Sequence, residues 1–235
     1  MLGRITMVNH GAMPEQEADR PLNPQTQGKH PPFRLDRPER GIAKRAFSAL
    51  VNPAVERALA FHRLNAVYDD VCQNPTDDHF AEKVLESLKV TVDISERELE
   101  RIPKTGPLIV VANHPFGAVD GMILMSILHR ARPDAKVMAN FLLARIEELR
   151  DMLICVDPFE GDGAKARNLG PLKDAIRHVK SGGALGCFPA GEVAHLDLQK
   201  RAIVDPQWSE TIAGIVRRTG ATVVPLYFHG RNSPL

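Results

Sequence analysis

The chain has 235 residues, 43% hydrophobic and 25% charged, so it can bury a sizeable core and belongs to the globular class. A formal net charge of +1 and an aromatic content of 5% give no sign of a nucleic-acid partner, and we expect none. The three cysteines include no Cys-x-x-Cys pair, which argues against a disulfide framework or structural zinc. No apolar run reaches the roughly 18 residues that a membrane-spanning helix needs, so we expect a protein that is soluble or bound to a membrane surface.

Residues 1–40 are predicted to be a disordered tail, because they contain six prolines and many polar residues without hydrophobic periodicity. From Gly41 apolar residues recur at helical spacing and Pro53 divides the run, so residues 41–76 are predicted to be an amphipathic helical segment. Between Gly41 and Arg63 four basic residues accompany one acidic residue. Such a segment can dock on an anionic membrane surface or form a helical cap on the main domain, and both interpretations remain open.

Residues 77–235 show the pattern of an α/β domain. A helix is predicted over 77–88, with Asp77 or Asp78 as its N-cap, and a strand over 89–95. Short apolar runs then alternate with helical segments. They predict strands at 107–112, 135–140, 152–157, 184–188 and 222–228, and helices at 120–130, 141–150, 165–180 and 208–219. This order indicates an α/β fold, with a mainly parallel central sheet flanked by helices and an N-terminal helical appendage.

The segments that follow the strands are the expected location of the chemistry, since ligands of such sheets bind beyond the carboxyl ends of the strands. These segments read NHPFGAVD, NFLL, PFEGD, PAGE and HGRN. The first contains His114 and, six residues later, Asp120 near the start of the next helix. An aspartate there can accept a hydrogen bond from Nδ1 of His114, which leaves Nε2 free as a base, and the helix N-terminus offers N–H groups to an oxyanion. The alternative is a helix cap at Asn113 or Asp120 with His114 as a satisfied turn residue.

Other polar groups follow the later strands. Gly191, after Pro189, predicts a sharp turn at which the backbone can approach a ligand, and Glu192 lies next to it, in the crevice or on a surface loop. Cys187 lies inside an apolar strand and is predicted to be a buried residue rather than a nucleophile.

The acidic run around 157–162 carries three carboxylates, but no His pair or similar ligand pattern accompanies it, so we expect a loop and no metal site. No GxGxxG, Walker-type or GxSxG motif is present, which leaves nucleotide-binding and serine-hydrolase functions without support.

Four segments, taken in order, resemble the motifs of the glycerolipid acyltransferase superfamily, which includes the bacterial 1-acyl-glycerol-3-phosphate and lysophospholipid acyltransferases. VVANHPFGAVDG resembles the first motif, MLICVDPFEGD the second, GGALGCFPAGE the third and ATVVPLYFHG the fourth. The resemblance covers about residues 85–235, and a hemolysin-like subgroup looks similar. It implies an O-acyltransferase in which His114 is the general base and Asp120 orients it.

The motifs depart from the family pattern in three places. Five residues separate His114 from Asp120 where four are common, and the glycine of HPFG is expected to accommodate the extra one. Ala190 stands where the third motif usually has Glu, with Glu192 two residues later and no Arg after the glycine; Pro158 replaces the usual Arg of the second motif. Because that Arg of the third motif helps to hold an acceptor phosphate in the family, a larger head group or a lyso-aminolipid of the ornithine type competes with lysophosphatidic acid.

The resemblance implies transfer of a fatty acyl group from acyl-CoA or acyl-carrier protein to the hydroxyl of a lyso-lipid, without a cofactor. It also implies a peripheral protein at the cytoplasmic face of the membrane, and further C-terminal elements, since family members usually continue beyond HGRNSPL. A phospholipid-dependent transacylase and a non-catalytic lipid-binding protein are the alternatives. The residues expected to contact substrate are Asn113, Phe116, Gly117, Pro189, Gly191, Glu192 and Arg231, the last as a substitute positive charge.

Overall fold

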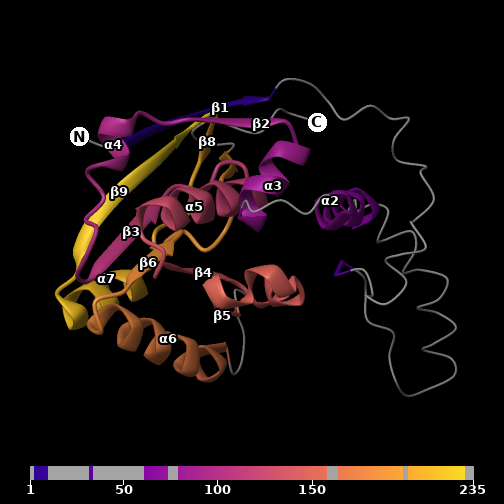
Figure 1. Ribbon diagram of the computed structural model, residues 1–235. Helices are drawn as coiled ribbons and strands as arrows, with labels where there is room; N and C mark the ends of the chain where they lie inside the picture. The colour runs from indigo at the N-terminus through magenta and orange to yellow at the C-terminus, as the bar shows by residue number, and fades with distance from the viewer. Residues whose placement is uncertain are drawn as a thin grey trace, which may run out of the picture. The chain divides into compact units, whose positions relative to one another are not determined.

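The computed structural model describes residues 3–9, 32–33, 61–73, 79–157, 164–197 and 201–230 (Figure 1). The chain divides into two compact units, one formed by residues 1–10 and 79–235 and the other by residues 11–78. None of the helices in the described ranges combines the length and the apolar character that crossing a bilayer requires.

The smaller unit contains helix α2 (Phe61–Gln73). Val67 and Val71, one helical turn apart, are buried. The Asn65 side chain ties the helix to Phe33, because its Nδ2 donates to the Phe33 carbonyl at 2.9 Å and its Oδ1 accepts from the Phe33 N–H at 3.1 Å. Helix α2 falls within the predicted helical segment 41–76, and the remainder of that segment lies outside the described residues.

The larger unit is built on a seven-stranded sheet with the order β2-β1-β9-β3-β6-β4-β5. Strand β2 runs antiparallel to β1, and every other neighbouring pair in this sheet is parallel. The mainly parallel α/β sheet predicted from the sequence is therefore confirmed. The strands are β1 (Gly3–Asn9), β2 (Val90–Asp93), β3 (Leu108–Ala112), β4 (Lys136–Asn140), β5 (Leu153–Val156), β6 (Ala184–Cys187) and β9 (Thr222–His229).

Strand β1 lies inside the segment that the sequence predicts to be disordered, and the prediction is wrong there. The stretch GRITMVN pairs in parallel with β9 and antiparallel with β2. Local composition does not reveal such a strand, because the ladder that holds it comes from segments distant in the sequence. The rest of residues 1–40, apart from residues 32–33, lies outside the described part of the chain.

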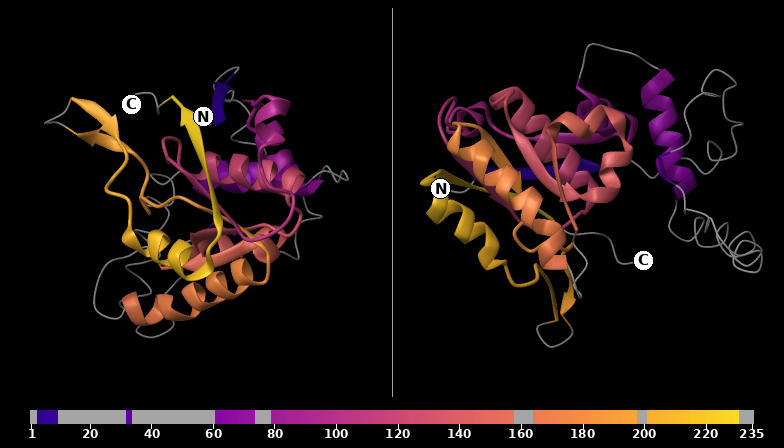
Figure 2. Two further views of the ribbon diagram at one scale, coloured as in Figure 1. Left: turned by 90° about the vertical axis from the view of Figure 1, so that its left-hand side faces the viewer. Right: turned by 90° about the horizontal axis from the view of Figure 1, so that it is seen from below.

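Helices cover both faces of the sheet (Figure 1). On one face lies α5 (Ala118–Ala131), whose Leu124 and Leu128 pack against Gly186 of β6, and α3 (Phe80–Ser87) packs against α5. On the other face α6 (Ala164–Lys180) and α7 (Glu210–Thr219) lie side by side (Figure 2). Their buried side chains form a core with the opposite-facing residues of the strands, including Ile109 and Leu185. Alternate strand residues thus face the two helical layers, as expected for a sheet buried on both sides.

Two predicted helices differ in detail. Helix α3 follows His79 rather than Asp77 or Asp78, because the extended His79 is its N-cap and its Nδ1 accepts from the Ala81 N–H at 3.3 Å. The helix predicted over 141–150 is a pair of 3-10 helices, η3 (Phe141–Arg145) and η4 (Glu147–Met152). Ile146 between them is extended and buried, so anchoring of its side chain in the core interrupts the helical backbone.

The other helical ends agree with the sequence signals. Helix α7 is capped by the Ser209 hydroxyl, which accepts from the Thr211 N–H at 3.2 Å, and it ends at Gly220, whose φ of 65° is left-handed. A short helix, α4 (Glu96–Leu99), precedes β3. Between β6 and α7 the chain makes an antiparallel hairpin of β7 (His195–Asp197) and β8 (Ala202–Val204), which the sequence did not predict because three-residue strands carry no readable alternation.

Candidate active site

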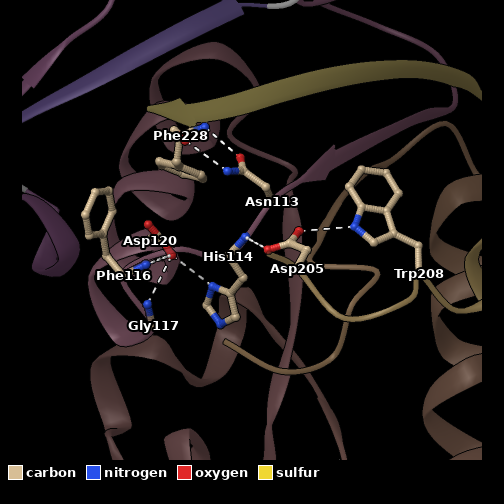
Figure 3. A network of polar contacts seen from close by, with 8 residues as sticks. All are labelled: Asn113, His114, Phe116, Gly117, Asp120, Asp205, Trp208 and Phe228. Carbon is tan, nitrogen blue, oxygen red and sulfur yellow. Dashed lines mark hydrogen bonds and ion pairs between the residues drawn. The ribbon is translucent and has the colours of Figure 1, made fainter. Parts of the chain in front are cut away.

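The carboxyl ends of β3, β6 and β9 bring the first, third and fourth motifs together. His114 follows β3 and stacks on Phe188, which follows β6, with ring centroids 4.1 Å apart and an interplanar angle of 22°. Asn113 is joined to Phe228 of β9: its Nδ2 donates to the Phe228 carbonyl at 2.9 Å, and its Oδ1 accepts from the Phe228 N–H at 2.7 Å (Figure 3). The predicted convergence at this edge of the sheet is confirmed for these three motifs.

His114 and Asp120 form a hydrogen-bonded pair. The His114 Nδ1 and the Asp120 Oδ2 are 3.0 Å apart, with the histidine side chain 17% exposed and the aspartate fully buried (Figure 3). The same Oδ2 accepts from the backbone N–H groups of Phe116 at 2.7 Å and Gly117 at 3.1 Å. An ionised carboxylate only accepts hydrogen bonds, so Nδ1 of His114 is the donor in this pair when Asp120 is ionised.

Gly117 is the residue that lets the five-residue spacing work. It caps α5 with φ 72° and ψ −127°, a conformation that residues with a Cβ rarely adopt. A Cβ at this position would also meet Val193 Cγ2 at 3.4 Å. The tight turn places Asp120 at the third helical position, from which its carboxylate reaches back to His114. The positive φ of Gly117 thus belongs to the turn in which Asp120 reaches His114 across five intervening residues.

The environment of Asp120 is unusual for a carboxylate. Burial raises the pKa of Asp120, while the hydrogen bonds from His114, Phe116 and Gly117 and the charge of His114 oppose that rise. Its second oxygen, Oδ1, is buried and accepts no hydrogen bond from the described residues. The backbone N–H groups of Phe116 and Gly117, just before α5, both donate to this carboxylate. These donors hold the orienting carboxylate.

Of the predicted substrate-contact residues of the first motif, Asn113 and Phe116 have different surroundings. The Asn113 side chain is occupied by the backbone of Phe228, so the structure gives it a role in holding β3 to β9. The Phe116 ring is half-buried and lies against Gly230, where an added Cβ would come within 2.7 Å of Cζ.

The third-motif residues form a turn beside His114. The Pro189 carbonyl accepts from the Ser209 N–H at 2.9 Å, and the Gly191 N–H donates to the Phe188 carbonyl at 3.0 Å. Gly191 has φ 72°, which confirms the sharp turn, and Glu192 next to it is exposed. Arg231, the proposed substitute cation, lies outside the described residues.

Sequence reasoning missed the residues that hold the backbone of His114. Asp205 Oδ1 accepts from the His114 N–H at 3.1 Å, and its Oδ2 accepts from Trp208 Nε1 at 3.1 Å (Figure 3). The His114 carbonyl accepts from the Ala194 N–H at 2.9 Å. Asp205 lies 91 residues from His114 in the sequence, so no spacing or periodicity could reveal the contact. The nearest sequence signal for this contact was the single Trp of the chain, Trp208, three residues after Asp205.

Two further predictions concern Cys187 in β6 and the part of the second motif that follows β5. Burial raises the pKa of the Cys187 thiol to about 12, and its Sγ donates to the Val110 carbonyl at 3.7 Å, so the predicted buried thiol is confirmed. Asp157 accepts from Arg167 Nε at 2.6 Å, and the Asn168 side chain binds the backbone N–H and carbonyl of Asp157 at 2.8 Å each. This part of the second motif anchors the start of α6. The described residues contain no group of three or more His, Cys, Asp or Glu that could hold a metal ion.

Comparison with known proteins adds a family to this geometry. An acyltransferase family model matches residues 55–233. A lyso-glycine lipid O-acyltransferase of Phocaeicola vulgatus is 32% identical over 155 residues, which are 66% of this chain and 52% of that protein. A protein of the same name from Bacteroides thetaiotaomicron is 32% identical over 156 residues, 66% of this chain and 54% of that protein. The chain spans about half the length of these relatives, and the hemolysin-like subgroup stays a prediction. The match over most of its length shows that the chain belongs to the acyltransferase family.

Proposed function

We propose that the protein is an O-acyltransferase that moves a fatty acyl group from an acyl thioester to the hydroxyl of a lyso-lipid. The observation that carries this proposal is the 3.0 Å hydrogen bond between His114 Nδ1 and Asp120 Oδ2 in a chain of the acyltransferase family. The names of the two relatives support both the reaction class and a lipid acceptor.

The proposed mechanism uses His114 as a general base. Its Nε2 takes the proton of the acceptor hydroxyl while the hydroxyl oxygen attacks the thioester carbonyl. The Asp120 carboxylate holds the Nδ1 proton and stabilises the imidazolium that forms. When the tetrahedral intermediate collapses, the C–S bond breaks and the imidazolium returns the proton to the leaving sulfur. The acyl group passes directly to the acceptor, and Cys187, buried with a raised pKa, takes no part.

For the acceptor we propose a lyso-aminolipid, with lyso-glycine lipid as the first candidate. Both relatives carry that substrate in their names. The third motif supports the choice, because no Arg follows Gly191 and the exposed Glu192 stands next to it. A carboxylate beside the site disfavours a phosphate dianion, which proteins usually bind through cations. Lysophosphatidic acid is therefore the weaker candidate.

A panel of donors and acceptors tests this proposal. Labelled acyl-CoA, acyl-carrier protein or diacyl phospholipid is incubated with lyso-glycine lipid, lyso-ornithine lipid or lysophosphatidic acid, beside a His114→Ala control. We expect product from a thioester donor and an amino-acid lyso-lipid. Product from phospholipid alone would make the protein a transacylase. Lipid binding without product in any combination would favour the non-catalytic alternative.

For the cellular location we propose peripheral attachment at the cytoplasmic face of the membrane. The lyso-lipid resides in a bilayer, and residues 41–63 carry the basic side chains Lys44, Arg45, Arg57 and Arg63. Attraction of each basic side chain to an anionic surface is worth about 1 kcal/mol. Flotation with phosphatidylserine-containing liposomes tests the proposal when these four are changed to Ser. Substitution is preferable to deletion of the N-terminus, because β1 belongs to the sheet. Unchanged flotation of the substituted protein would exclude the basic segment as the anchor.

A further inference from the structure

We propose that Asp205 is a positioning residue that holds the backbone of His114 in register for the transfer reaction, an inference that rests on the proposed function. The Asp205 Oδ1 accepts the His114 N–H at 3.1 Å. Asp205 comes from the segment between β8 and α7, whereas His114 follows β3, so the contact joins two separate parts of the fold.

The main chain of His114 is held on both sides. Its N–H donates to Asp205, and its carbonyl accepts from the Ala194 N–H at 2.9 Å. Ala194 directly precedes the β7–β8 hairpin, and Asp205 directly follows it. The segment between β6 and α7 therefore binds the main chain of His114 twice, through the backbone N–H of Ala194 and the carboxylate of Asp205.

Asp205 is itself fixed in position. Its second oxygen accepts from Trp208 Nε1 at 3.1 Å, so both oxygens are engaged and the carboxylate cannot rotate freely (Figure 3). The next residue, Ser209, caps α7 and donates its N–H to the Pro189 carbonyl at 2.9 Å. The capped start of α7 therefore lies close to Asp205 in the chain and is tied to Pro189, and through Asp205 it is connected to the backbone of His114.

The hydrogen bonds to the His114 backbone matter because a small shift of the His114 ring would disturb its two contacts. The His114 ring must keep both the 3.0 Å contact with Asp120 and the 4.1 Å stack on Phe188. Among the described residues, Asp205 accepts hydrogen bonds from the His114 N–H and from the Trp208 indole, and neither bond involves the His114 ring. Its loss should therefore change the rate of the chemical step more than the binding of substrate. Misplacement of a catalytic group by about 1 Å can lower a rate by about 100-fold.

Kinetics of three variants test the inference. We expect Asp205→Ala to lower kcat by about 10- to 100-fold while KM for the lyso-lipid changes less than about twofold. Asp205→Asn combined with Trp208→Phe should regain part of the kcat lost in Asp205→Ala, because the amide oxygen can still accept from the His114 N–H and no indole N–H faces the amide NH2 group. Glu210→Ala, an exposed carboxylate at the start of α7, is the matched control and should retain wild-type kcat.

A second readout does not depend on turnover. The rate at which diethyl pyrocarbonate modifies His114, followed by peptide mass spectrometry, should rise several-fold in Asp205→Ala, with the exposed His129 as the internal reference. Unchanged kcat and unchanged His114 reactivity in a folded Asp205→Ala protein would overturn the inference while wild-type turnover stands. A lowered Tm with wild-type kcat per folded molecule would also overturn it. If the wild type transfers no acyl group but His114 reactivity responds as expected, the proposed function fails and the link from Asp205 to His114 stands.

Discussion

Asn113 and Phe228 join β3 to β9 through two hydrogen bonds, of 2.9 and 2.7 Å, between one side-chain amide and one backbone residue. Phe228 is nearly fully buried, so its N–H and carbonyl at this point depend on Asn113 rather than on water. His114 is the next residue along the chain. The asparagine of the first motif therefore fixes the strand end from which the histidine projects.

Asn113→Ala should lower the free energy of unfolding by about 2 kcal/mol, since burial of an unpaired backbone group costs about 1–3 kcal/mol. Urea unfolding followed by circular dichroism measures the change. Acyl transfer by the folded fraction should fall as well, because the end of β3 is no longer tied to β9. An unfolding free energy equal to that of the wild type would contradict the assigned role.

Gly117→Ala should destabilise the protein and reduce activity, because a Cβ at φ 72° is strained by about 1–3 kcal/mol and approaches Val193. Gly121→Ala is the matched control on the same helix. Outside its own helix backbone, no atom of the described residues lies within 4 Å of a Cβ added at Gly121, so we expect a gain of about 0.4–1 kcal/mol. Thermal unfolding of both variants provides the measurement. Equal Tm changes at the two positions would show that the turn does not require glycine.

Asp120→Asn should separate stability from activity. The raised pKa of Asp120 means that the folded state holds its proton more tightly than the unfolded state, so this carboxyl lowers stability as pH rises from about 3.8 through the raised value. The Asn variant lacks this loss, and its stability advantage should grow over that pH window and then stay level. Transfer activity should drop about 100-fold or more, since general-base catalysis contributes about 10²–10⁴. Urea titrations at several pH values test the first part. A wild type that gains stability over the variant with rising pH would refute it.

His79 should make the protein less stable in mild acid. Burial lowers the pKa of His79 and the neighbouring His129 lowers it further, against an opposing effect of Glu82. The unfolded state therefore takes up the proton first, and the stability present above pH 6.5 is lost as pH falls through the lowered value. Protonation also weakens the cap, because Nδ1 accepts from Ala81. His79→Asn keeps a cap acceptor without the titration, so its Tm should fall less than that of the wild type between pH 8 and pH 5. Parallel Tm curves for the two proteins would exclude this role.

The parallel strands of the sheet, the His114–Asp120 pair and the turn at Gly117 follow from local sequence signals. The apolar runs at β3 and β6 are short and unalternating, which identified parallel strands buried on both faces. The order strand, His114, glycine, Asp120 and helix predicted the hydrogen-bonded pair of His114 and Asp120, because the contacts that form it all lie between residues 114 and 120. Gly117 carried its own signal, since only glycine readily adopts its backbone conformation.

The remaining parts depend on contacts between distant segments. Strand β1 is defined by its hydrogen-bonded pairing with β9 and β2. The role inferred for Asp205 depends on its hydrogen bond with His114, which is 91 residues away in the sequence. Asn113 was interpreted as a substrate contact, but the backbone of Phe228 on another strand occupies its amide. A single sequence contains no record of which distant groups meet, so these roles required the three-dimensional arrangement.

The most direct test of the central proposal is the acyl-transfer rate of wild type and His114→Ala with lyso-glycine lipid and a thioester donor, at equal concentrations of folded protein. We predict that the wild type forms the diacylated lipid and that His114→Ala is about 10²- to 10⁴-fold slower. A folded His114→Ala protein that transfers the acyl group at the wild-type rate would contradict general-base catalysis by the His114–Asp120 pair.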